Sequence, residues 1–192
     1  QDIKSHAGSI IRINKISGSS QNLNNINSWS PELFTKGHRN PQGMAINPTT
    51  NEIWVNEHGP KGGDEINIIK LGRNYGWPIV SEGSHYSGIK IPSHETYPEF
   101  QAPELFWVPT IAPSGLAFYE GTKFAAWNGN ALIGGLRSRA LIRIAFNDDE
   151  PEEVERFSWS KRVRDLEVSK DGMIWVIEDG DNARLIKFFK SQ

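Results

Sequence analysis

The sequence predicts an all-β protein of the β-propeller class, and three observations lead to this prediction. The apolar segments are short, have the length of strands and are separated by turn residues. A pattern of three strands separated by turns recurs along the chain, with a further strand before each copy. The 18 glycines and 7 tryptophans suit a chain of many turns and aromatic strands. No segment shows a sustained helical period.

The apolar segments follow one another in a repeating order. The copies begin with "GMAINP", "GLAFYE" and "RDLEVS", and an insertion at about residues 71–103 stretches the first spacing. Four antiparallel strands over roughly 40–50 residues are typical of a propeller blade. The predicted strands are residues 9–13, 32–35, 43–46, 52–56, 65–69, 104–107, 115–119, 131–134, 141–144, 154–157, 165–168, 173–176 and 184–188.

The number of blades predicts an incomplete ring. The sequence contains about three four-stranded blades and a leftover strand at residues 9–13, whereas propellers usually have about 4–8 blades. Three blades alone would leave open strand edges, which favour aggregation. We therefore expect residues 1–192 to form one partial β-propeller, the C-terminal half. An N-terminal half or a second copy of the chain would close the ring, and a meander sandwich is the alternative fold.

The composition excludes several classes of protein. Lys plus Arg is 21 and Asp plus Glu is 23, so a net charge of −2 offers no basic excess for a nucleic-acid partner. Cysteine is absent, which excludes disulfides and thiolate metal sites. No run of about 18 apolar residues occurs, so we expect no membrane span. The chain starts without Met and without a signal-peptide pattern, and we expect a fragment or a processed chain.

The first candidate motif is HRNPQG at residues 38–43. It lies between an outer strand and the innermost strand of the next blade, near the predicted central channel. The Arg39 guanidinium is a planar fork that suits carboxylates, and Asn40 and Gln42 add amide donors and acceptors. A surface loop with a proline turn and an exposed salt bridge is the other reading.

The second candidate motif is NEHGPKGGDE at residues 56–65. Its glycines let the backbone approach a ligand closely, and the Pro60 carbonyl is an outward acceptor. Asp64 and Glu65 add hard oxygen, and such ligands favour calcium over zinc or copper. A polar hairpin loop is the other reading.

The insertion holds the third candidate, with RNYGWP at residues 73–78 and HYSG at residues 85–88. Long ordered loops are often functional. The aromatic side chains would stack on a flat ligand, or Trp77 would simply hold a surface lid in place.

The fourth candidate is a basic set formed by Arg137, Arg139, Arg162 and Arg164. At strand period, Arg162 and Arg164 point to the same side, where they would form a carboxylate-binding wall. A solvated pair facing acidic side chains of its own strand is the other reading.

The four candidates fall at equivalent points of successive blades, so we expect them to converge on one channel mouth. Together they describe a cationic pocket next to an oxygen-lined cation site. A small polyanion bound together with calcium would suit it.

The motifs RNPQG, EHGPKGGDE and NYGWP, in that order, resemble those of the soluble dehydrogenases of glucose and other aldose sugars that depend on pyrroloquinoline quinone (PQQ). The resemblance runs from about Gly8 to Phe189. It implies a six-bladed propeller that oxidises the C1 hydroxyl of an aldose sugar to a lactone and passes a hydride to PQQ.

The resemblance also implies which residues bind PQQ. Arg39 would stabilise negative charge on the reduced cofactor and, with nearby Asp64, support catalysis. Arg137 stands where a lysine is common in the family, which changes the geometry of its contact. The implied PQQ contacts are Arg39, Asn40, Gln42, Tyr86, Arg137, Arg162 and Arg164.

Two calcium ions are implied by the same resemblance. The main-chain carbonyls of Gly59 and Pro60 would bind the ion that activates the quinone. Glu65 and the Tyr75 carbonyl would bind a second, structural ion.

One group that the resemblance calls for is absent. The family's general base is a histidine in the N-terminal half, and no histidine of this chain falls on the matching motif. Hydride transfer needs that base to take the hydroxyl proton. We therefore expect this chain alone to be inactive.

Other readings of the function stay open on the sequence. A non-catalytic propeller module that binds a protein or carbohydrate would lose the Arg39-Asn40 and Arg162/Arg164 sets, which this sequence keeps. A lactonase-type hydrolase would direct more acidic and amide side chains into its channel. Because the family works where PQQ is loaded, we expect a periplasmic or secreted protein.

Overall fold

The computed structural model describes residues 1–20, 28–148 and 150–189, and these residues confirm the all-β prediction. They form strands β1 to β13 and two short 3-10 helices, His94–Thr96 and Ala125–Trp127. Within these ranges no helix is long and apolar enough to cross a membrane.

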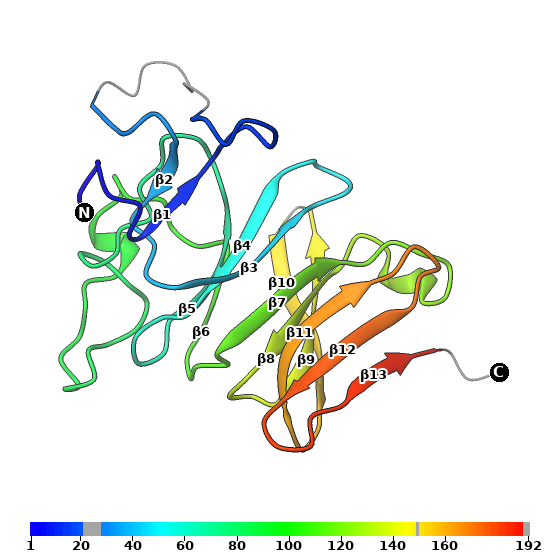
Figure 1. The fold of residues 1–192 in the computed structure, drawn as a ribbon. Coiled ribbons are helices and arrows are strands. Elements are labelled where there is room, and N and C mark those ends of the chain that lie inside the picture. The colour runs from blue at the N-terminus through cyan, green and yellow to red at the C-terminus, as the bar shows by residue number, and fades with distance from the viewer. Residues whose placement is uncertain (21–27, 149, 190–192) are drawn as a thin grey trace.

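Four antiparallel sheets follow one another along the chain (Figure 1). Each joins strands that are consecutive in the sequence. Their strands are β1 (Ser9–Ile11) and β2 (Leu33–Lys36); β3 (Pro41–Ile46), β4 (Ile53–Glu57), β5 (Asp64–Ile68) and β6 (Leu105–Trp107); β7 (Pro113–Phe118), β8 (Ala131–Gly135), β9 (Ala140–Asn147) and β10 (Glu150–Ser158); and β11 (Arg162–Val168), β12 (Ile174–Asp179) and β13 (Leu185–Phe188).

The predicted strand positions are confirmed, but their grouping into blades is corrected. The strand before each copy completes the preceding sheet, since β6 pairs with β5 and β10 pairs with β9. The described residues therefore form two four-stranded blades, one three-stranded sheet and one two-stranded sheet. The physical reason is that each outer strand runs antiparallel beside the strand just before it, whose edge is still unpaired.

The innermost strands β3, β7 and β11 contact one another in chain order, and the sheets spread outward from them (Figure 1). Strand β8 is buried on both faces because it lies between two other sheets. Ile133 packs with Trp54 and Ile66 of the blade before it, whereas Leu132 packs with Val163 of the sheet after it. This alternation gives the face-to-face stacking of propeller blades.

The insertion after β5 is attached to the end of β2 by main-chain hydrogen bonds. Tyr75 N donates to Lys36 O (2.9 Å), and Trp77 N donates to Gly37 O (2.9 Å). Gly37 has a φ of 81°, and a Cβ at this position would collide with the backbone of Tyr75 and Gly76. The glycine therefore lets the insertion place Trp77 beside the start of the HRNPQG motif.

Candidate functional site

A pocket of about 880 Å3 lies between the loops that follow β4, β6 and β8, the insertion after β5 and the segment that leads into β3. This volume falls within the range of about 300–1,000 Å3 that is usual for small-molecule sites. The predicted residues that line it are Arg39, Asn40, Gly59, Pro60, Asp64, Tyr86 and Arg137. The predicted residues outside its walls are Gln42, Glu65, Tyr75, Arg162 and Arg164.

The pocket wall carries more positive than negative charge. Arg39, Lys61 and Arg137 line it, and in the described part of the wall Asp64 is the one acidic side chain. The sequence prediction did not include Lys61. This balance favours a ligand with negative charge.

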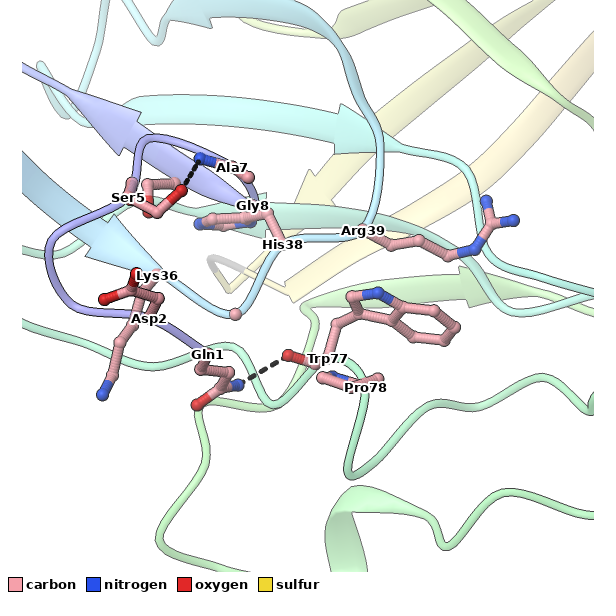
Figure 2. A pocket seen from close by; sticks show the side chains of 12 residues that line it. Gln1, Asp2, Ser5, Ala7, Gly8, Lys36, His38, Arg39, Trp77 and Pro78 are labelled. Carbon is pink, nitrogen blue, oxygen red and sulfur yellow. Dashed lines mark hydrogen bonds between the residues drawn. The ribbon is translucent and has the colours of Figure 1, made fainter.

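Arg39 projects over Trp77, with its guanidinium carbon 5.3 Å from the ring centroid (Figure 2). Its Nη1 donates to His58 O (3.2 Å), and its buried Nε has no partner among the described residues. A guanidinium has five N–H donors. The stacking on Trp77 therefore fixes the plane of a group whose hydrogen-bonding capacity is largely unused.

A smaller groove of about 370 Å3 also touches Arg39 and Trp77 (Figure 2). Gln1 closes it by donating from Nε2 to Trp77 O (2.6 Å), and Lys36 lines its wall. The groove shares just Arg39 with the predicted site residues. The larger pocket, which holds seven of them, is the better candidate site.

Asn40 is held between two neighbouring side chains. Gln42 Nε2 donates to Asn40 Oδ1 (3.0 Å), and Asn40 Nδ2 lies 3.4 Å from His58 Nδ1. His58 Nε2 lies 2.7 Å from Pro113 O, and a carbonyl accepts only, so Nε2 carries the proton and Nδ1 accepts from Asn40. The geometry gives Gln42 a supporting place behind Asn40, while the contact of both with PQQ stays a prediction.

Asp64 joins two loops of the pocket wall. Its Oδ1 accepts from Gly59 N (3.0 Å), and its Oδ2 accepts from Ile111 N and Ala112 N (both 2.7 Å) and from the Thr110 hydroxyl. The residue is 1% exposed. Its carboxylate therefore holds the loop that carries Gly59, and the catalytic support predicted for it stays a prediction.

The carbonyls of Gly59 and Pro60 have the chemistry of a cation site. Neither oxygen accepts a hydrogen bond from any described residue. A Cβ at Gly59 would collide with the backbone of Gly62 and Gly63, so only glycine fits the turn. In the described ranges no group of three or more His, Cys, Asp or Glu side chains can hold a metal. A cation here would rest on carbonyl oxygens, which suit hard ions such as calcium.

Glu65 faces a second, much smaller cavity of about 10 Å3 that Tyr75 also lines. Burial raises the pKa of its carboxyl well above the usual range, and the nearby Glu57 carboxylate adds to this effect. The Tyr75 carbonyl already lies 3.2 Å from His94 Nε2. The space suits one water-sized occupant, and the Tyr75 carbonyl already faces His94. The calcium site predicted for Glu65 and Tyr75 stays a prediction.

Arg162 and Arg164 lie on the same side of β11, as the strand period predicts. Both bind Asp179 Oδ2 on β12, Arg162 through Nε at 3.1 Å and Arg164 through Nη2 at 2.7 Å. The hydrogen bond from Arg164 lowers the pKa of Asp179. Arg164 lines a separate cleft of about 420 Å3 between the inner strands. The binding of PQQ carboxylates by this pair stays a prediction.

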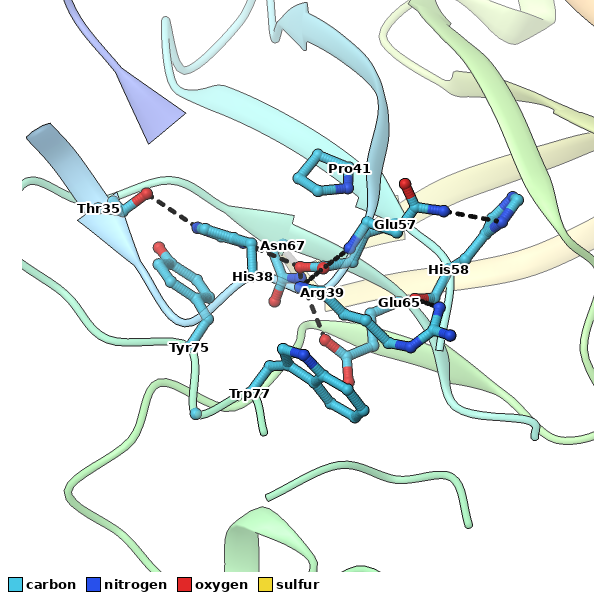
Figure 3. A network of polar contacts seen from close by, with 12 residues as sticks. Thr35, His38, Arg39, Pro41, Glu57, His58, Glu65, Asn67, Tyr75 and Trp77 are labelled. Carbon is cyan, nitrogen blue, oxygen red and sulfur yellow. Dashed lines mark hydrogen bonds and ion pairs between the residues drawn. The ribbon is translucent and has the colours of Figure 1, made fainter. Parts of the chain in front are cut away.

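The sequence did not predict the contact between two residues of the motifs, His38 and Glu57. His38 and Glu57 meet through Nδ1 and Oε1 at 2.9 Å, directly behind Arg39 (Figure 3). The available signal was their position at the adjoining ends of β3 and β4, where Pro41 pairs with Glu57.

The comparisons with known proteins agree with this fold. The family described as Glucose / Sorbosone dehydrogenase matches residues 1–187. The chain is 42% identical over 160 residues to the aldose sugar dehydrogenase YliI of Escherichia coli (strain K12), covering 81% of this chain and 43% of that protein.

Two solved structures show the same arrangement of strands. The apo form of the soluble aldose sugar dehydrogenase from Escherichia coli matches with a TM-score of 0.91 at 38% identity, covering 97% of this chain and 56% of that chain. The PQQ-bound aldose sugar dehydrogenase from Streptomyces coelicolor matches with a TM-score of 0.73 at 27% identity, covering 97% of this chain and 53% of that chain. The chain thus spans about half the length of these relatives, and it belongs to the glucose/sorbosone dehydrogenase family of β-propeller proteins.

Proposed function

We propose that this chain is the C-terminal half of a quinoprotein that oxidises the C1 hydroxyl of aldose sugars to lactones, with PQQ and calcium as cofactors. The observation that carries the proposal is the cationic pocket of about 880 Å3, with Arg39 and Arg137 in its wall and two carbonyls beside them that accept no hydrogen bond from the described residues. The structural likeness to a PQQ-bound aldose sugar dehydrogenase supports the choice of cofactor.

PQQ suits this pocket because it is planar, anionic and rich in acceptor oxygens. Arg39 offers a guanidinium plane already fixed over Trp77, and Lys61 and Arg137 add positive charge. Tyr86 is 75% exposed, so its ring is accessible to a flat ligand. The carbonyls of Gly59 and Pro60 would hold calcium beside it.

When bound, PQQ supplies a two-electron acceptor for the sugar hydride, and calcium makes the quinone more electrophilic. This chain's residues bind and orient the cofactor. Arg39 would donate hydrogen bonds to it. Asn40 presents an amide held by Gln42 and His58, and Asp64 holds the Gly59 loop in place.

The histidines at the site already have partners. His58 uses one ring nitrogen toward Pro113 O and the other toward Asn40. His38 lies against Glu57 and Thr35, away from the pocket wall. We propose, as the family resemblance implies, that the base that takes the sugar's hydroxyl proton lies on the N-terminal half, together with part of the sugar site.

The setting proposed for the protein follows from the same resemblance. The N-terminal half of the propeller, or a second copy of the chain, would close the ring beside β1 and β11. We propose a periplasmic or secreted location, where PQQ is loaded, with a separate molecule as the electron acceptor.

The test uses the complete protein that contains this chain, stripped of cofactors and then supplied with PQQ and calcium. We expect dye reduction with glucose or another aldose that needs both additions. There are two controls. One is the same protein without PQQ, and the other is the protein supplied with PQQ after a chelator has been added to bind the calcium. Absence of PQQ-dependent turnover with every aldose tested would contradict the proposed function.

A further inference from the structure

The geometry points to Glu57 as a positioning residue, locked by His38, that holds the backbone of Arg39 and Asn40 at the pocket wall (Figure 3). Glu57 itself lies outside the described lining of that pocket, so it acts through the two residues that do line it. The consequence for PQQ binding rests on the proposed function, whereas the control of the backbone does not.

One carboxylate oxygen of Glu57 accepts two successive main-chain donors. Arg39 N lies 2.7 Å from Oε2, and Asn40 N lies 3.2 Å from the same atom. Hydrogen bonds to a charged acceptor are stronger than those between neutral groups. The segment that enters β3 is therefore fixed by a side chain from the end of β4.

The other carboxylate oxygen is held just as closely. His38 Nδ1 lies 2.9 Å from Oε1, and Asn67 Nδ2 donates to it at 3.3 Å. Since a carboxylate only accepts, His38 Nδ1 carries a proton. Both oxygens of Glu57 thus have two donors each, which leaves the carboxylate one orientation.

His38 is itself fixed on both sides. Its Nε2 lies 2.8 Å from the Thr35 hydroxyl, and its ring stacks on Tyr75 with the centroids 4.5 Å apart. His38 is 1% exposed and Glu57 is 3% exposed, so water has little access to replace either contact. The chain of contacts runs from β2 through His38 and Glu57 to the two pocket residues.

The direction of the Arg39 side chain depends on this backbone. The guanidinium reaches Trp77 and His58 O from a main chain whose N–H is held by Glu57. A loosened backbone at residues 39 and 40 would spread the guanidinium and the Asn40 amide over several orientations. Ligand binding would then have to restore the order that Glu57 maintains.

The chain offers a matched control in a second histidine–glutamate contact. His94 Nδ1 lies 2.9 Å from Glu82 Oε1, the same distance as in the His38–Glu57 contact. Glu82 Oε1 accepts from the main-chain N of His94, within the insertion. Glu82→Gln therefore removes a similar charge without touching the backbone of Arg39 or Asn40.

The experiment compares Glu57→Gln with Glu82→Gln in the complete protein without cofactor, by hydrogen exchange of individual amides. Glutamine keeps the shape but has one acceptor oxygen, so it cannot serve the two main-chain donors and the His38 Nδ1–H together. We expect exchange at Arg39 and Asn40 to become about tenfold faster or more in Glu57→Gln. Exchange there should stay unchanged in Glu82→Gln, and the amides of β8 and β9 should keep their protection in both variants.

A calorimetric titration with PQQ and calcium is the second arm. We expect Glu57→Gln to weaken PQQ binding about tenfold. The urea midpoint of unfolding should change far less than it would if the blade unfolded. If the wild-type protein binds no PQQ, the proposed function fails, while the exchange arm still decides the role of Glu57.

Unchanged exchange at Arg39 and Asn40 in Glu57→Gln would overturn the inference, as would an equal change in Glu82→Gln. If Glu57→Gln does not fold, His38→Phe replaces it, because phenylalanine keeps a ring on Tyr75 and removes the Nδ1 donor. Faster exchange confined to residues 39 and 40 in that variant supports the inference, and unchanged exchange refutes it.

Discussion

The carboxylates of Asp64 and Asp179 both have donor or cationic partners, but their surroundings differ. Asp64 is almost fully buried and accepts from three main-chain N–H groups and the Thr110 hydroxyl. Asp179 accepts a side-chain hydrogen bond from Arg164 and forms an ion pair with Arg162, and these two arginine side chains are 45% and 49% exposed. One aspartate fixes the backbone of the pocket wall, and the other balances the charge of two exposed arginines at the end of β12.

The difference teaches which contacts prepare a binding site. A buried carboxylate surrounded by main-chain donors cannot exchange them for water without a large cost. Exposed ion pairs contribute little to stability and rearrange readily. We therefore infer that the pocket near Arg39 is preorganised, whereas the Arg162/Arg164 pair adjusts when an anionic ligand arrives.

The largest expected effect comes from Asp64→Asn. The amide presents an N–H2 group to donors that Asp64 now satisfies, which leaves buried N–H groups without acceptors. We expect a loss of about 1–3 kcal/mol in the free energy of unfolding of the complete protein, measured by urea denaturation at neutral pH. Asp179→Asn is the matched control, and an equal effect of both changes would remove the contrast between the two regions.

The next effect concerns the ligand rather than the fold. Arg39→Ala removes a charged donor group whose plane is fixed over Trp77. We expect PQQ binding to weaken about 10- to 100-fold, since hydrogen bonds to charged groups contribute about 1.5–3 kcal/mol. Arg39→Lys should recover only part of this affinity, because lysine keeps the charge and loses the planar fork.

Fluorescence titration with PQQ in the presence of calcium measures both variants. The matched change in the other region is Arg162→Ala, for which we expect a smaller loss that shrinks further as the salt concentration rises. A larger loss for Arg162→Ala than for Arg39→Ala would reverse the inferred ranking of the two regions.

The smallest effect is a pH dependence at Asp179. The hydrogen bond from Arg164 lowers the pKa of Asp179 in the folded protein. The ionised carboxylate therefore adds stability above its unfolded pKa of about 4, and this contribution is lost as the pH falls through the lower folded value. Urea midpoints of the wild type and Asp179→Asn should differ slightly at pH 7 and converge as the pH falls below about 4; a gap that widens on acidification would contradict this assignment.

The fold was largely accessible from the sequence because turn residues bound each strand. The sequence did not show which neighbouring strand each outer strand pairs with. The segment at residues 105–107 stands next to the following repeat in the sequence, yet it returns beside β5 after the insertion. Such a return is decided by where a strand edge remains unpaired, which local sequence patterns do not encode.

The site was accessible where its residues belong to contiguous motifs. One motif leads into β3 and the other follows β4, and the start of β3 lies beside the end of β4. This pairing brings together Arg39, Asn40, Gly59 and Pro60. The positioning role of Glu57 was missed because it depends on the register that sets Pro41 opposite Glu57. The ion pair between Arg162 and Asp179 also depends on strand register, because β11 and β12 pair with these two residues directly opposite each other.

A crystal structure of the complete protein with PQQ and calcium tests the central claim most directly. We predict planar density in the pocket between Arg39 and Arg137, with PQQ oxygens within hydrogen-bonding distance of Arg39 and Asn40 and an ion at the Gly59 and Pro60 carbonyls. PQQ bound instead in the groove lined by Gln1 and Lys36, or a pocket that stays empty at saturating PQQ, would contradict the account.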